Sequence, residues 1–158
     1  MSKKTNALRI LEANKASFET VEYNYEADDL SVEHIAEANA LPLERIYKTL
    51  VAKGDKQGVV VAVIPGHCSL SFKALAKASG NKKITLVPVK DIQGLTGYIR
   101  GGCSPIGMKK DYPTFIDASA QLHDKIFVNA GQHGLLVGLA PADLLRLTQG
   151  VLEDIAEG

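Results

Sequence analysis

The sequence predicts an α/β fold for residues 1–158: a single domain with a mixed sheet of six to seven strands, or an open barrel, surrounded by short helices. Two observations support this prediction. The chain has 158 residues, 46% hydrophobic and 23% charged, as expected for one globular domain of ordinary size. Short segments with helical spacing of apolar residues are mixed with short strand-like segments, in an order that is not a regular strand–helix alternation.

In the first half of the chain, helix starts and one buried strand are the clearest signals. Ser31 and Ser71 are good N-caps, and Gly80 is a good helix end. Residues 59–64, Val-Val-Val-Ala-Val-Ile, are the most hydrophobic run and are predicted to form a buried strand. The other predicted elements are a helix at 5–12, a strand at 18–25, a turn at Asp28 and Asp29, a helix over 32–36, a strand at 46–53, a hairpin loop at 53–58 and a helix at 72–79.

In the second half, short strands alternate with turns. Pro141 suits the first position of a helix, Asp143 suits its first turn, and Gly150 is predicted to end it. The other predicted elements are a strand at 84–87, a helical turn at 89–93, strands at 114–117, 126–129 and 135–139, a helical turn at 119–122 and a turn at 130–134.

The stretch from residue 97 to 110 reads G-Y-I-R-G-G-C-S-P-I-G-M-K-K. It is unsuited to a regular helix or a central strand, because glycine loses the most backbone freedom on ordering and proline lacks a donor. Gly101 and Gly102 have no Cβ to keep a ligand away from their N–H groups, and Ser104 adds a hydroxyl. The stretch is therefore a candidate anion or carbonyl site. A glycine-rich hairpin between two strands is an equally good interpretation.

Lys48 stands out in the predicted strand at 46–53, where it shares a face with Leu50 and Ala52. A lysine in apolar surroundings must be paired, face a cleft or lose its charge. In a cleft, its ammonium group can hold an ester carbonyl, a carboxylate or a phosphate. On an edge strand it would instead deter aggregation. The pattern leaves both interpretations open.

No complete motif for a metal site, a protein nucleophile or a nucleotide loop is present. Cys68 and Cys103 form no Cys-x-x-Cys pair and are predicted to be free thiols. Cys103 is conceivable as a nucleophile backed by His123 or His133, but a small apolar filler in a tight loop is the simpler interpretation. We therefore expect no metal and no cofactor.

The charge of the chain is zero in total but unevenly distributed. Residues 45–110 carry twelve basic and two acidic side chains, whereas the segments on either side each carry a net charge of −5. A neutral total argues against unspecific coating of nucleic acid, but the middle segment can form a basic patch, with Lys82, Lys83, Lys109 and Lys110 as its clusters. The N-terminus lacks an apolar leader and no run is long enough to span a bilayer, so we expect a cytoplasmic protein without a membrane partner.

Three segments together resemble the YbaK/EbsC family, the free-standing relatives of the editing domain inserted in bacterial prolyl-tRNA synthetases. They are I-Y-K-T-L-V at 46–51, T-G-Y-I-R-G-G-C-S-P-I-G-M-K-K at 96–110 and P-T-F-I-D at 113–117. The resemblance implies an enzyme, an aminoacyl-tRNA deacylase that hydrolyses mischarged Cys-tRNA(Pro). It also implies that the substrate's own groups or an oriented water attack the ester, with no protein nucleophile and no metal.

Carried over residue by residue, the resemblance implies a set of site residues. Lys48, Gly101, Gly102 and Ser104 match the positions that act on the ester. Tyr23 and Thr49 match substrate-binding positions, and Asn129 and Gly131 are expected to bind substrate because their stretch lies near the pocket in the family. The implied partner is the acceptor end of tRNA(Pro), with choice of tRNA partly left to prolyl-tRNA synthetase.

The chain departs from the family pattern at two places. The stretch Asn129-Ala130-Gly131-Gln132-His133 stands where relatives carry serine and glycines followed by a basic pair, and Leu136 stands where they carry an aspartate. The departures leave the preferred amino acid open. Alternatives are therefore a deacylase of Ala-tRNA(Pro) or of broad specificity and, in another class, a non-catalytic module that binds tRNA ends or prolyl-tRNA synthetase.

Overall fold

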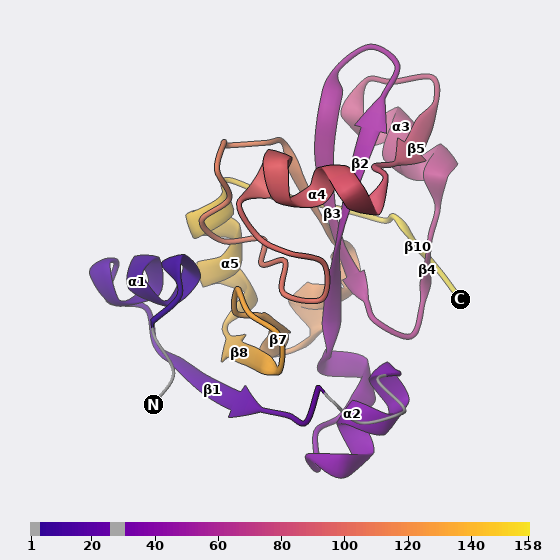
Figure 1. The fold of residues 1–158 in the computed structure, drawn as a ribbon. Helices are drawn as coiled ribbons and strands as arrows, with labels where there is room; N and C mark the ends of the chain where they lie inside the picture. The colour runs from indigo at the N-terminus through magenta and orange to yellow at the C-terminus, as the bar shows by residue number, and fades with distance from the viewer. Residues whose placement is uncertain (1–3, 26–30) are drawn as a thin grey trace.

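The computed structural model describes residues 4–25 and 31–158 (Figure 1). Its largest sheet has five strands in the order β5-β2-β3-β6-β9. β3 pairs antiparallel with β2 and parallel with β6, so the sheet is mixed. The strands are β2 (Tyr47–Gly54), β3 (Gly58–Pro65), β5 (Ile84–Leu86), β6 (Thr114–Asp117) and β9 (Val151–Glu153).

A second, antiparallel sheet has the order β1-β8-β7. It consists of β1 (Phe18–Glu22), β7 (Ile126–Asn129) and β8 (Leu135–Leu139). The two sheets meet at a parallel bridge between Ile46 and Phe127. A small antiparallel pair, β4 (Ser69–Leu70) with β10 (Ala156–Glu157), lies beside the C-terminus.

Five α-helices surround these sheets in the described part of the chain (Figure 1). The predicted caps Ser31 and Ser71 are confirmed, because their hydroxyls accept from the N–H groups of His34 and Ala74. The last helix ends at Gln149, which has φ 54°, one residue before the predicted Gly150. The helices are α1 (Asn6–Ala13), α2 (Val32–Ala38), α3 (Phe72–Ser79), α4 (Val89–Thr96) and α5 (Pro141–Thr148), with 3-10 turns η1 (Leu43–Arg45) and η2 (Ala118–Leu122).

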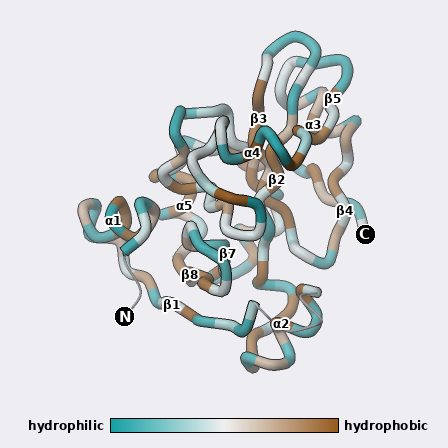
Figure 2. Tube along the Cα trace, viewed as in Figure 1, coloured by the Kyte–Doolittle hydropathy of each residue, from teal (hydrophilic) through white to brown (hydrophobic). Residues whose placement is uncertain are grey.

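The β2–β3 hairpin has apolar core on both faces, and Figure 2 shows hydrophobic colour on β3 and hydrophilic colour at the tip of the hairpin. Val61 and Val63 of β3 pack on one face with residues of α1, β7, β8 and α5. Val60, Ala62 and Ile64 pack on the other face with α3. Since side chains alternate along a strand, an uninterrupted hydrophobic run is what a strand covered on both faces requires.

None of the helices in the described residues is both long and apolar enough to cross a membrane.

The predicted α/β class with a mixed sheet is confirmed, but the single sheet of six to seven strands is divided into separate sheets. The predicted strand at 18–25 ends at Glu22. The short strands β4, β9 and β10 do not follow from the sequence, because two or three residues carry no detectable periodicity. The turn predicted at Asp28 and Asp29 lies outside the described residues.

Asp117, at the end of β6, is almost fully buried and joins three parts of the fold. One carboxylate oxygen accepts from the N–H groups of Ile155 and Ala156 at 3.0 and 2.9 Å. The other accepts from the Ser119 N–H and hydroxyl. The Ser119 hydroxyl also lies 2.7 Å from the hydroxyl of Tyr47 on β2. The carboxylate therefore holds the C-terminal segment against β6 and η2.

We predict that Asp117→Ala lowers the free energy of unfolding by about 3 kcal/mol, because it leaves several buried donors without an acceptor. Urea denaturation of both proteins measures this loss. Asp143→Ala is the matched control: its carboxylate pairs with Arg146 at the surface, and its loss is expected to cost less than about 1 kcal/mol. Equal midpoints for the two variants would contradict the role assigned to Asp117.

Candidate functional site

The middle of β2 has a strand partner on one edge only. β3 pairs with β2 along its whole length, whereas β5 pairs only with Ala52–Gly54. On the same edge as β5, the Val87 N–H donates to the Val51 carbonyl at 3.0 Å. At the other end, Ile46 bridges to Phe127. Between these points, residues 47–50 have no ladder partner on that edge within the described parts of the chain.

A cavity of about 180 Å³ opens on this unpaired edge. Four consecutive residues, 46–49, line it. Alternate residues of a strand point to opposite faces, so consecutive lining residues mean that the cavity faces the strand edge and not one side of the sheet. The remaining lining residues are Tyr23, Val32, Ile35, Gly101, Cys103, Asn129 and Leu136.

The structure brings five of the eight predicted site residues to this cavity and leaves three away from it. Tyr23, Lys48, Thr49, Gly101 and Asn129 line it, whereas Gly102, Ser104 and Gly131 do not.

Lys48 is half-buried, and its cross-strand neighbour on β3 is the fully buried Ile64. Its ammonium group makes no hydrogen bond and no ion pair with any other described residue. Lys48 therefore combines the two predicted situations: it lies on an unpaired strand edge, and that edge borders a cleft. Its charge is available to a ligand in the cavity.

Thr49 has a buried hydroxyl oxygen that finds no hydrogen-bond partner among residues 4–25 and 31–158. Buried hydroxyls are nearly always bonded, since an unmet group costs about 1–3 kcal/mol. The Thr49 hydroxyl is thus an unsatisfied polar group in a residue of the cavity lining, directly after Lys48.

The glycine-rich stretch contributes Gly101, whose φ of +83° favours glycine. A Cβ at this position would lie 2.5 Å from the His133 ring. The N–H of Gly102 already donates to the Ile99 carbonyl at 2.9 Å, so it is not free for a substrate. The hydroxyl of the fully buried Ser104 accepts from the Ile106 N–H at 3.2 Å, which shapes the loop.

Asn129 lines the cavity, but its amide group already bonds to protein atoms. Its Nδ2 donates to the Gly101 carbonyl at 2.9 Å and to the Gln132 carbonyl at 3.3 Å, and its Oδ1 accepts from the Gly131 N–H at 2.7 Å. Gly131 has φ +105° and packs beside Tyr98. Asn129 therefore fixes two loops relative to each other, which makes it a positioning residue in this structure.

An apolar wall of the cavity is formed by Val32, Ile35, Ile46 and Leu136, of which only Leu136 stands out in the sequence, as a departure from the family pattern. Val32 and Ile35 were recognised as one face of a helix, but nothing in the sequence indicates what that face meets. Leu136 lies on the central strand of the second sheet and is 6% exposed. The wall favours a small apolar or sulfur-containing group next to the Lys48 ammonium.

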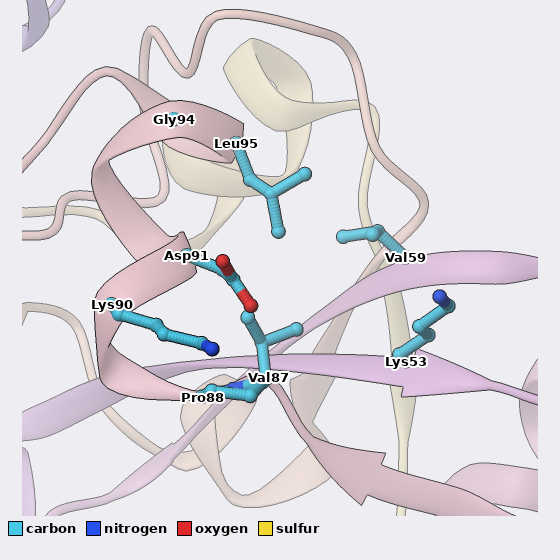
Figure 3. Close-up of a pocket in the computed structure, with 8 residues that line it drawn as sticks. All are labelled: Lys53, Val59, Val87, Pro88, Lys90, Asp91, Gly94 and Leu95. Carbon is cyan, nitrogen blue, oxygen red and sulfur yellow. The ribbon is translucent and has the colours of Figure 1, made fainter.

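A larger groove of about 560 Å³ lies between the β2–β3 hairpin and α4, and Figure 3 shows its lining. None of the predicted site residues lines it.

In the described residues, no three His, Cys, Asp or Glu side chains are grouped as a metal would require.

Cys103 lies in the cavity lining, and burial raises the pKa of its thiol to about 11, although a hydrogen bond with the Thr96 side chain acts in the opposite direction. At pH 8 only about one thiol in a thousand is then ionised, and the thiolate is the nucleophile.

We predict that alkylation of Cys103 by iodoacetamide, measured in a Cys68→Ser variant, accelerates about tenfold for each pH unit from 7 to 10. Free cysteine in the same buffers is the control, and its rate levels off near its pKa of about 8.5. A plateau for Cys103 below pH 9 would show an activated thiol and contradict this prediction.

Comparison with known proteins identifies the family of the chain. The model of the family described as "Aminoacyl-tRNA editing domain" matches residues 27–147. EbsC of Enterococcus faecalis, named as a candidate Cys-tRNA(Pro)/Cys-tRNA(Cys) deacylase, is 49% identical over 152 residues, which cover 96% of this chain and 93% of EbsC.

Two further comparisons connect the chain to prolyl-tRNA synthetases. The proline–tRNA ligase of Thermosipho africanus is 32% identical over 91 residues, 58% of this chain and 16% of the ligase. The crystal structure of a candidate trans-editing enzyme for prolyl-tRNA synthetase has the same fold, with a TM-score of 0.83 at 23% identity and coverage of 99% and 100%. The resemblance found in the sequence is confirmed, and the chain belongs to the aminoacyl-tRNA editing domain family.

Proposed function

We propose that this protein is a trans-editing aminoacyl-tRNA deacylase that hydrolyses the ester of mischarged Cys-tRNA(Pro). The observation that carries the proposal is that Lys48, Thr49 and Gly101 line one small cavity, where the Lys48 ammonium and the Thr49 hydroxyl have no partner among residues 4–25 and 31–158. Family membership and the name of EbsC support it.

The cavity suits a small aminoacyl group. Its volume of about 180 Å³ and its apolar wall of Val32, Ile35, Ile46 and Leu136 accommodate a cysteine or alanine side chain. An aminoacyl ester is already activated, so the protein needs only to orient it and stabilise negative charge on the carbonyl oxygen. Lys48 and the N–H of Gly101, which has no acceptor within the described residues, are the groups we assign to that charge.

We further propose that the attacking group belongs to the substrate. The cysteine thiol, or a water oriented by the ribose hydroxyl, attacks the carbonyl carbon. The bond to the ribose oxygen then breaks, and that oxygen takes up the proton that the attacking group loses. The raised pKa of Cys103 supports this mechanism, because a protonated thiol in the cavity is a poor competing nucleophile.

Leu136 favours a second candidate within the same class. An apolar residue on the cavity wall contacts the methyl group of alanine as well as the sulfur of cysteine. The alternative substrate is therefore Ala-tRNA(Pro), or a broader set of small amino acids. Choice of the tRNA body is proposed to depend partly on prolyl-tRNA synthetase.

We predict that the purified protein releases cysteine from Cys-tRNA(Pro) faster than alanine from Ala-tRNA(Pro), and leaves Pro-tRNA(Pro) intact. Deacylation assays on the three charged tRNAs, with and without a chelator, measure this. A preference for Ala-tRNA(Pro) would select the second candidate. Binding of charged tRNA without release of any amino acid would identify a non-catalytic module and overturn the proposal.

We predict that Lys48→Ala lowers the single-turnover rate by two to three decades, about 2–4 kcal/mol of transition-state stabilisation, by analogy with loss of one oxyanion donor. Lys48→Arg should restore only part of the rate, because a planar guanidinium doesn't replace a compact ammonium in a fitted cavity. A thermal melt of each variant accompanies the assay, since a collapsed melting temperature would make Lys48 structural.

Cys103→Ala is the control from the same cavity. It removes the other reactive side chain of the lining and should keep most of the rate. A covalent acyl-enzyme at Cys103, together with lost turnover in this variant, would refute the substrate-assisted mechanism.

A further inference from the structure

A second cavity of about 290 Å³ adjoins the first, and both are lined by Thr49, Gly101 and Cys103. The unpartnered hydroxyl of Thr49 therefore belongs to a residue at the boundary between them. The other lining residues of the second cavity are Leu50, Val51, Leu86, Val87, Val89, Ile92 and Arg100.

The lining of the second cavity matches a nucleoside with a phosphate. Its walls are aliphatic side chains from β2, β5 and α4, which suit the apolar faces of a flat base. Its one charged residue is Arg100, which is exposed and makes no ion pair within the described residues. A guanidinium group is well suited to bind phosphate.

A third hollow lies beside α4 (Figure 3). The groove beneath α4 shares Val87 with the second cavity. Lys53 from β2 and Lys90 from α4 border it, together with the carboxylate of Asp91 (Figure 3). Both lysines are exposed and lack an ion pair in the described chain, so the groove carries a net positive charge.

We propose that these three hollows form the path of the RNA 3′ end, with the terminal nucleoside in the second cavity and preceding phosphates along the α4 groove beside Lys53 and Lys90. This inference rests on the proposed function, which places the aminoacyl group in the first cavity. The ester joins that group directly to the terminal ribose, so the nucleoside must occupy the space that adjoins the first cavity. The second cavity is lined by three of the same residues and offers apolar walls and a cation.

The first test fills the second cavity from its rim. Val89 is 55% exposed and lines it, so Val89→Trp adds bulk there without disturbing the core. Val151→Trp is the matched control, because Val151 is 48% exposed on β9 and lines none of the three hollows. With a cysteinylated acceptor-stem minihelix as substrate, we expect KM to rise at least tenfold for Val89→Trp and less than twofold for Val151→Trp.

The second test counts phosphate contacts. The logarithm of minihelix affinity falls with the logarithm of salt concentration by about 0.7 per neutralised phosphate of a single strand. The double variant Lys53→Ala, Lys90→Ala should therefore reduce this slope by about 1.4. Lys73→Ala, Lys77→Ala is the charge-matched control on α3, where neither lysine lines a hollow, and its slope should equal that of the wild type.

The outcomes separate the two levels of the proposal. A wild-type protein that releases no amino acid would overturn the proposed function and, with it, the path. An active wild type whose KM responds equally to both tryptophans, or whose salt slope responds equally to both lysine pairs, would overturn the path alone. Thermal melts establish that each variant is folded.

Discussion

The incomplete pairing of β2 is the constraint on which the site depends. β2 begins beside the second sheet, at the Ile46–Phe127 bridge, and ends beside β5 in the first. Because these two neighbours lie at opposite ends of one strand, residues 47–50 between them have an edge that no strand of the described residues pairs with. That edge gives Lys48 and Thr49 access to a ligand while β3 holds the other edge along its full length. A rigid strand thus presents two adjacent polar side chains.

The opposite wall of the site comes from loops, and internal hydrogen bonds hold those loops in place. The Asn129 amide joins the Gly101 carbonyl to the turn after β7. Within the glycine-rich stretch, the hydroxyl of the buried Tyr98 donates to the Ile106 carbonyl at 2.7 Å. Burial raises the pKa of Tyr98 to about 12, so this donor keeps its proton over the whole physiological range. These hydrogen bonds therefore hold the loop backbone in place, and Gly101 puts no side chain between that backbone and a ligand.

The positive charges are concentrated near the site. The chain is neutral in total, yet the cations that border the three hollows, Lys48, Lys53, Lys90 and Arg100, come from its basic middle segment. Among the described residues that line these hollows, Asp91 alone carries a carboxylate. For an editing domain this arrangement concentrates attraction for a polyanion at the site while leaving the molecule without a large net charge.

The sequence by itself determined the local structure: the serine caps, the buried β3 run and the unusual glycine stretch all follow from the preferences of neighbouring residues. It also singled out Lys48, because a lysine among apolar strand residues needs an explanation. What Lys48 faces was decided only by the tertiary structure, since strand order and the unpaired edge of β2 depend on residues far apart in the chain. The same holds for the wall formed by Val32, Ile35 and Leu136, and for Asn129, whose amide was predicted to bind substrate and instead fixes two loops. Periodicity records which face of an element is apolar, but only packing decides which other segment that face meets.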